Sequence, residues 1–111
     1  MMPGMSAQTG PAVDVTVVVM TDCPHADLAA TRLRQALTNL GRDATTFTTV
    51  VVASAKDADQ AGLRGSPTFL VDGRDPFPGA ADAGWACRLY PTDEGLQGSP
   101  SVAQLEQVLK R

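Results

Sequence analysis

Cysteine, histidine and clustered basic residues are scarce in this chain. Its 111 residues include two cysteines, one histidine and nine lysines and arginines, and these basic residues form no run. Small secreted scaffolds need several disulfide bridges, so two cysteines argue against that class. Partners such as nucleic acid or an anionic membrane require a basic surface, which a net charge of −3 does not indicate. We therefore expect neither partner.

Long apolar stretches are also missing. No segment approaches the roughly 20 apolar residues of a transmembrane helix. Residues 1–11 are rich in Gly, Pro, Ser and Met, without the basic start and apolar run of a secretory signal. We therefore expect a cytoplasmic protein with a flexible segment at residues 1–12. Residues 13–111 are enough for one domain with a single core.

The hydrophobic pattern predicts strands and helices in alternation. Residues 13–20 are apolar on both faces of an extended segment, which is typical of a central strand. Pro24 then suits the first turn of a helix, which we expect to cover one sheet face and to end at Gly41. Residues 45–52 are rich in Thr and Val and predict a second strand, parallel to the first.

A second helix and a third strand follow. Ser54 has the character of an N-cap and predicts a short helix over residues 55–61, ended by Gly62. Residues 68–71 are apolar and predict a strand. The pair Asp72-Gly73 then predicts a tight turn.

The last third of the chain completes the predicted order βαβαββα. Residues 85–90 predict a fourth strand, antiparallel to the third. Residues 74–84 between them are longer than a hairpin turn and predict an inserted loop. Ser101 and Gln104 form a capping-box signature for a final amphipathic helix, which we expect on the other sheet face.

Cys23 stands where the first strand ends and the first helix begins. Backbone N–H groups and the dipole at a helix N-terminus favour the thiolate, and can lower a cysteine pKa from about 8.5 to roughly 3.5–7.5. A buried cysteine can also serve as a small apolar side chain. We interpret Cys23 as reactive because its neighbours Asp22, Pro24 and His25 do not resemble a core.

Cys23 and the segment Ser66-Pro67-Thr68 together resemble the thioredoxin superfamily, whose members carry a cysteine in the first strand-to-helix loop and a cis-proline before a later strand. The resemblance implies a three-layer α/β/α sandwich with a four-stranded mixed sheet. It also implies that Pro67 packs beside Cys23 and that the Ser66 backbone pairs with a substrate peptide or thiol conjugate. Residues 63–73 further resemble thioredoxin-like proteins of actinobacterial type, some of them named for a likeness to alkylmercury lyases.

The chain departs from the dithiol pattern of this superfamily. The nearest form, C-P-H-C, requires a second cysteine at position 26, where this chain has Ala26. The resemblance therefore implies a monothiol site, in which His25 matches a histidine that favours the anionic thiol and Pro24 contributes to substrate binding. An exposed histidine without a special role explains His25 equally well. A Cys-Pro-His segment supplies too few ligands for a closed zinc site, and we expect no metal and no cofactor.

Cys87 is the second cysteine. Strand alternation places it with Trp85 and Leu89, which favours a core position over a role as resolving thiol. In the implied topology Tyr90 approaches the Cys23 loop, and Cys87 lies farther along the strand. A Cys23–Cys87 disulfide needs Cα atoms within about 7 Å, which we do not expect without movement.

Three functions are consistent with these residues. The first is monothiol exchange with protein or low-molecular-weight disulfides, because exchange through a mixed disulfide needs one attacking sulfur. The second is a non-catalytic binding or scaffold domain that uses the groove beside Pro67. The third is a soft-metal or organomercurial binder that uses the thiolates of Cys23 and Cys87.

Overall fold

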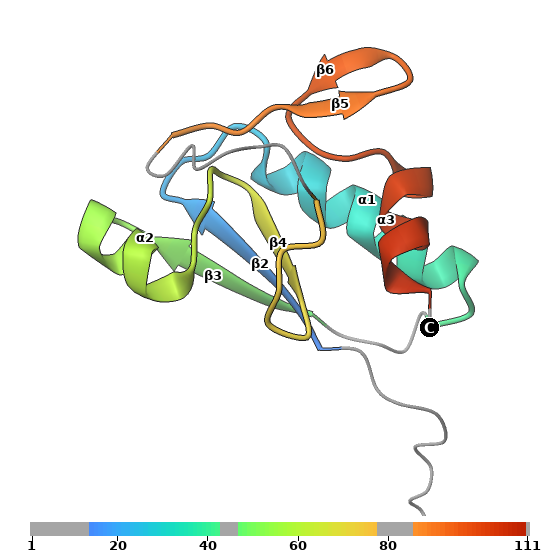
Figure 1. Cartoon of the computed structure of the whole chain (residues 1–111), viewed down its shortest axis with the longest axis horizontal. Helices are drawn as coiled ribbons and strands as arrows, with labels where there is room; N and C mark the ends of the chain where they lie inside the picture. Colours follow the sequence, from blue (N-terminus) through green and yellow to red (C-terminus); the bar gives the residue numbers. More distant parts are fainter. Residues whose placement is uncertain (1–13, 43–46, 78–85, 111) are drawn as a thin grey trace, which may run out of the picture.

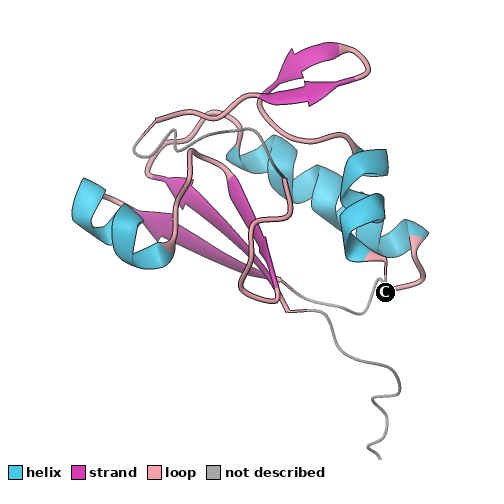
Figure 2. Cartoon of the chain, viewed as in Figure 1, coloured by secondary structure: helices cyan, strands magenta, loops and turns pink. Residues whose placement is uncertain are grey.

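The computed structural model describes residues 14–42, 47–77 and 86–110 (Figures 1 and 2). The predicted flexible segment 1–12 lies outside these residues. The described part is a small mixed α/β domain. Its helices are α1 (Ala26–Asn39), α2 (Ala55–Ala61) and α3 (Val102–Leu109), and its strands are β2 (Val15–Met20), β3 (Thr48–Val52), β4 (Thr68–Val71), β5 (Tyr90–Thr92) and β6 (Gly95–Gln97).

Strand β2 is the centre of the sheet, as its two apolar faces predict. It pairs in parallel with β3 and antiparallel with β4, in the order β3-β2-β4. Val15, Val17 and Val19 are buried on one face, and Val18 is buried on the other. The prediction of a central strand with a parallel neighbour is confirmed.

Helices cover both faces of this sheet, but their distribution differs from the expectation for the last helix. Helices α1 and α3 pack on the same face, where Leu33 and Leu105 belong to one buried cluster. Helix α2 packs on the other face through Ala58. The prediction that α3 lies opposite α1 is wrong. The connection into α3 lies over α1, because the Arg32 guanidinium donates to the carbonyls of Ser99 and Pro100, both at 3.1 Å.

Capping residues set the ends of α2 and α3. The Ser54 side chain accepts from the Asp57 N–H at 3.1 Å, and Gly62 ends α2 in the left-handed region at φ 83°. Ser101 and Gln104 form the reciprocal capping box of α3. The bounds predicted for α2 and the cap predicted for α3 are confirmed.

The turn after β4 also agrees with its sequence. Asp72 and Gly73 have φ of 53° and 82°, so both central residues occupy the left-handed region that a type I′ turn requires. Val71 and Arg74 on either side are hydrogen-bonded as an antiparallel pair.

The strand predicted over residues 85–90 is also wrong for the part of that segment that the structure describes. Among the described residues of the segment 85–90, only Tyr90 belongs to a strand, and it begins a separate hairpin of β5 and β6. Cys87 makes an isolated bridge to Ser66, and the bridge is parallel. The backbone of this segment pairs with Ser66, before β4, and the Arg88 side chain donates to the Asp75 carboxylate and the Phe77 carbonyl.

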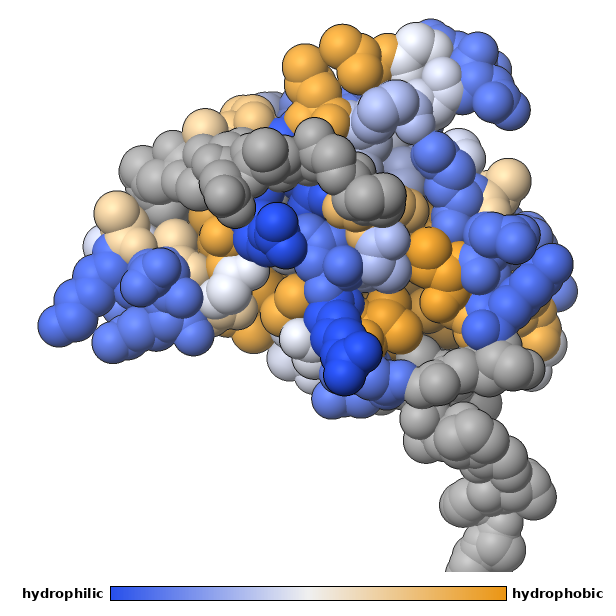
Figure 3. All heavy atoms as spheres, in the orientation of Figure 1, coloured by the Kyte–Doolittle hydropathy of each residue, from blue (hydrophilic) through white to orange (hydrophobic). Residues whose placement is uncertain are grey.

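The β5–β6 hairpin stands above α1 and α3 (Figure 1). Gln104 of α3 donates to the Pro91 carbonyl at 2.8 Å and connects the hairpin to the helices. Apolar atoms lie at the surface of this region, where Leu96 is 65% exposed (Figure 3). Within the described ranges, no helix has both the length and the apolar character needed to cross a membrane.

Candidate thiol site

Cys23 lies just beyond the carboxyl end of β2, as predicted. The chain turns there because Asp22 adopts a left-handed conformation at φ 60°, which Asp tolerates better than most residues. The Cys23 N–H donates to the Met20 carbonyl at 3.1 Å and closes this turn. The last residue of β2 therefore fixes the backbone of Cys23.

The approach to α1 differs slightly from the prediction. The Ala26 N–H donates to the Cys23 carbonyl at 3.2 Å, so residues 23–26 form a turn and α1 begins at Ala26. Pro24 is exposed in this turn and not in the helix; its fixed φ suits the second position of a β-turn. His25 is the N-cap residue, and its side chain makes no capping hydrogen bond.

The Cys23 side chain is half-buried. It packs at the border of the buried cluster beneath α1 and is neither sealed in the core nor fully exposed. Two carboxylates stand nearby in sequence, at Asp22 before the thiol and at Asp27 in the first turn of α1, and both residues are exposed. The uncapped helix N-terminus favours an anion at this position, whereas the two carboxylates oppose a further one.

The His25 ring packs on the backbone of Gly98, in the connection between β6 and α3. A Cβ added at Gly98 would lie 2.3 Å from both Cγ and Nδ1 of the ring, which is too close for any side chain. Within the described part of the chain, no hydrogen bond joins the His25 ring to the Cys23 sulfur. Sequence reasoning did not identify Gly98, because a close approach between distant segments leaves no local pattern.

Ser66 and Cys23 both form hydrogen bonds to the backbone of Met20. The Ser66–Pro67 bond is cis, as the resemblance implies, and Ser66 is completely buried. The Ser66 Oγ accepts from the Met20 N–H at 2.9 Å, while the Met20 carbonyl accepts from Cys23. The structure thus brings the predicted Ser66-Pro67 segment to the end of β2 from which the thiol projects.

The backbone of Ser66 is already paired within the chain. Its N–H donates to the Ala86 carbonyl at 2.7 Å, and its carbonyl accepts from the Arg88 N–H at 2.9 Å. Cys87, between these two residues, is exposed. The expectation that Cys87 lies in the core is wrong. Inward and outward side chains do alternate here, but it is Arg88 and Tyr90 that face inward. Cys87 therefore lies beside Ser66 and not farther along.

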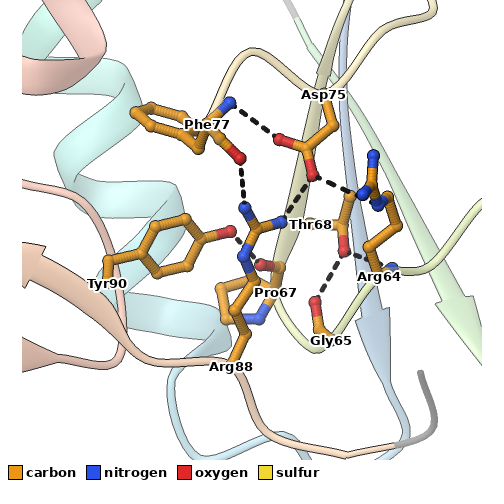
Figure 4. Close-up of polar contacts among 8 residues, drawn as sticks. All are labelled: Arg64, Gly65, Pro67, Thr68, Asp75, Phe77, Arg88 and Tyr90. Carbon is orange, nitrogen blue, oxygen red and sulfur yellow. Dashed lines mark hydrogen bonds and ion pairs between the residues drawn. The ribbon is translucent and has the colours of Figure 1, made fainter. Parts of the chain in front are cut away.

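Arg88 fixes this segment and is the functional residue that sequence reasoning missed (Figure 4). Its guanidinium donates to the Asp75 carboxylate at 2.6 Å and to the Phe77 carbonyl at 2.8 Å. The side chains of Arg88 and Asp75 are only 1% and 3% exposed. The Nε of Arg88 is buried without a hydrogen-bond partner among the described residues. The one signal in the sequence was an arginine flanked by apolar residues, near an acidic loop.

Tyr90 connects the same segment to Pro67. Its hydroxyl donates to the Pro67 carbonyl at 2.5 Å, and Arg88 lies over its ring at 4.5 Å from the centroid. Burial raises the pKa of the Tyr90 phenol well above its usual value; the nearby Arg88 charge partly offsets this effect, and Asp75 adds to it. Phe69 and Phe77 pack edge-to-face around the Tyr90 ring.

A second feature lies apart from the thiol. A hollow of about 280 Å³ opens between α1, the β5–β6 hairpin and the start of α3, and its lining includes none of the predicted site residues. In the described portion of the chain, no group of three or more His, Cys, Asp or Glu residues is placed to hold a metal ion.

Comparisons of the chain with family models, with curated proteins and with solved structures give no match. The case for a function therefore depends on what Cys23, Ser66 and Cys87 can do in this geometry.

Proposed function

We propose that the chain is a monothiol thioredoxin-like protein that exchanges thiols and disulfides through Cys23. The observation that carries this proposal is that Cys23 and Ser66 both form hydrogen bonds to the backbone of Met20, at the end of β2 and before α1. A half-buried thiol before an uncapped helix can both reach a small substrate and interact with the helix dipole. We propose that the protein is cytoplasmic, where the reducing environment would keep the Cys23 thiol reduced.

The proposed reaction has two exchange steps. The Cys23 thiolate attacks one sulfur of a disulfide R–S–S–R′, forms the mixed disulfide Cys23–S–S–R and releases R′–S⁻. A low-molecular-weight thiolate then attacks this mixed disulfide, takes R as a new disulfide and restores the Cys23 thiolate. The electron pair that reduces the substrate comes from the external thiol, so no cofactor enters the balance.

Cys87 is the candidate resolving thiol in a variant of the second step. It is exposed and lies beside Ser66, and Ser66 and Cys23 both form hydrogen bonds to the backbone of Met20. Attack of Cys87 on the mixed disulfide would release R–S⁻ and leave a Cys23–Cys87 disulfide for the external thiol to reduce. His25 packs at Gly98, and its proposed part is to orient the turn that contains Cys23.

Single-cysteine variants test the proposal. Cys87→Ser leaves only Cys23, and Cys23→Ser leaves only Cys87, so alkylation by iodoacetamide reads each thiol separately. We expect Cys23 to react about tenfold faster than Cys87 at neutral pH, despite its lower exposure, because Cys23 lies before the uncapped N-terminus of α1. We also expect only chains with Cys23 to catalyse reduction of bis(2-hydroxyethyl) disulfide by an external thiol.

A binding or scaffold domain is the second candidate. Two observations favour it: Cys23 packs at the border of the core, and the backbone of Ser66 is already paired. A scaffold predicts that Cys23 reacts more slowly than the exposed Cys87, as burial alone would dictate, and that Cys23→Ser leaves disulfide reduction unchanged. Either result would contradict the exchange function.

A further inference from the structure

Strand β4 is an edge of the three-stranded sheet that the structure describes, and the cis Ser66–Pro67 segment precedes it. In the described sheet β4 pairs only with β2, so its other side is where an extended peptide could add as a further strand. Ser66 precedes β4 and is bonded to Met20, next to Cys23. A peptide disulfide that docked by strand addition would therefore pair with the backbone of Ser66.

That backbone is occupied. The Ser66 N–H and carbonyl both pair with the segment Ala86–Arg88, at 2.7 Å and 2.9 Å. Because one residue offers one donor and one acceptor on its main chain, no backbone group of Ser66 is left to pair with a second extended strand. The chain itself thus fills the position that a substrate strand would take.

The occupying segment is anchored too firmly for easy displacement. The Arg88 guanidinium and the Asp75 carboxylate are both almost completely buried, and separating such a pair leaves an uncompensated charge in the core. Two further hydrogen bonds hold the segment: Arg88 donates to the Phe77 carbonyl, and Tyr90 donates to the Pro67 carbonyl (Figure 4).

We propose that the segment Ala86–Arg88 permanently covers the backbone of Ser66, at the position where a substrate strand would pair. The site then accepts small disulfides and excludes strand-forming peptides. This inference rests on the exchange function proposed for Cys23 and names its substrate class. A small disulfide needs only contact with the half-buried sulfur, whereas a peptide must compete with the bonded segment for the same two backbone groups.

The test compares two substrates that share a leaving group. One is N-acetylcysteine methylamide and the other an extended peptide of about six residues with a central cysteine, each capped as a mixed disulfide with thionitrobenzoate. The Cys87→Ser variant confines the reaction to Cys23, and released thionitrobenzoate gives the rate. We expect the peptide to react no faster than the short conjugate. A peptide rate at least tenfold higher would overturn the proposal, since tenfold corresponds to about 1.4 kcal/mol of docking.

Variants of the Arg88–Asp75 ion pair provide the second part of the test. Replacing the buried ion pair by Asp75→Asn with Arg88→Met loosens the segment without leaving a lone charge, and we expect the peptide rate to rise at least threefold relative to the short conjugate. Arg64→Met is the matched control, because Arg64 approaches the same carboxylate at 4.0 Å with a side chain that is 52% exposed. We expect its ratio of rates to equal that of the parent.

The outcomes separate this inference from the exchange function. A Cys23 that reacts with neither conjugate faster than an unfolded chain contradicts both. A Cys23 that reacts with both conjugates but favours the peptide tenfold contradicts only the proposed cover of Ser66. If the double variant fails to fold, amide hydrogen exchange of the parent decides the second part of the test: exchange of the Ser66 and Arg88 N–H groups as slow as the core supports a permanent cover, and fast exchange contradicts it.

Discussion

At the residue scale, a few backbone positions hold the candidate thiol. Asp22 in a left-handed conformation turns the chain out of β2, and the carbonyl of Met20 holds Cys23 at that turn. The other end of the site depends on Gly98, because its hydrogen-only side chain lets the His25 ring pack against the backbone. Substitutions at these positions should act through geometry and not through lost apolar area.

The contact between Gly98 and His25 gives a prediction at this scale. Gly98→Ala places a methyl group inside the ring, so we expect the ring to move and the free energy of unfolding to fall by about 1–3 kcal/mol, as in other overpacked sites. Urea denaturation measures the loss. His25 is the single histidine, so its imidazole proton resonances report the displacement directly.

The double variant His25→Ala/Gly98→Ala is the control for this prediction. Removal of the ring should restore most of the stability that Gly98→Ala alone loses, because the two residues are in contact and their effects are not additive. Equal losses from Gly98→Ala in the presence and absence of the ring would contradict the contact.

At the scale of elements, the ion pair of Arg88 and Asp75 connects the segment after residue 85 to the chain that follows β4. The backbone of that segment pairs with Ser66, and the next strand forms in a separate hairpin. The apolar ring cluster of Phe69, Phe77 and Tyr90 packs beneath the same segment. The loop at residues 74–77 is therefore part of the structural support of the site.

Breaking this ion pair should be more costly than removing it. Arg88→Met removes the 2.6 Å partner of the buried Asp75 carboxylate and leaves only the Phe77 N–H and the more distant Arg64 beside it, so we expect a loss of about 3–5 kcal/mol in the free energy of unfolding. Asp75→Asn/Arg88→Met should lose less, because an Asn oxygen can still accept from the Phe77 N–H, which now donates to Asp75 at 2.9 Å.

The exposed neighbour of the same carboxylate provides the comparison. Arg64→Met should change the free energy of unfolding by less than about 1 kcal/mol, since the Arg64 side chain is half exposed and stands 4.0 Å from the carboxylate, at the limit of an ion pair. Denaturation of the three variants under one buffer condition checks the order. A double variant less stable than Arg88→Met would contradict the interpretation of a buried pair.

At the scale of the whole molecule, the buried phenol of Tyr90 couples stability to alkaline pH. Its folded-state pKa is raised above the unfolded value of about 10, so this group supports the fold fully below pH 10 and loses that support as the pH rises further. The slope should approach about 1.4 kcal/mol per pH unit above pH 10. Stability to denaturant between neutral and alkaline pH measures it.

Tyr90→Phe isolates this effect. The variant loses the hydrogen bond to the Pro67 carbonyl, worth about 1 kcal/mol at neutral pH, but its stability should decline less steeply above pH 10 than that of the parent. Tyr90 is the single tyrosine, so tyrosinate absorbance should appear in the parent only as the chain unfolds. Tyrosinate formed in the folded protein at pH 10 would contradict the prediction.

The sequence by itself determined the features that depend on neighbours along the chain. The two-sided apolar strand β2, the Ser54 and Ser101 caps and the Asp72-Gly73 turn follow from local periodicity, side-chain hydrogen bonding and backbone preference. Cys23 at the end of β2 follows from the break in the apolar run, whereas Ser66-Pro67 before β4 was predicted from the resemblance to the thioredoxin superfamily.

Only the tertiary structure decided which distant segments of the chain pack around the thiol site. The pairing of Ser66 with Ala86 and Arg88, the exposed position of Cys87 and the ring of His25 on Gly98 join segments that are far apart in sequence. Strand alternation gave two faces for residues 85–90 but not which one turns inward. The face with Arg88 can turn inward only if a carboxylate neutralises the buried guanidinium, and folding places Asp75 beside it.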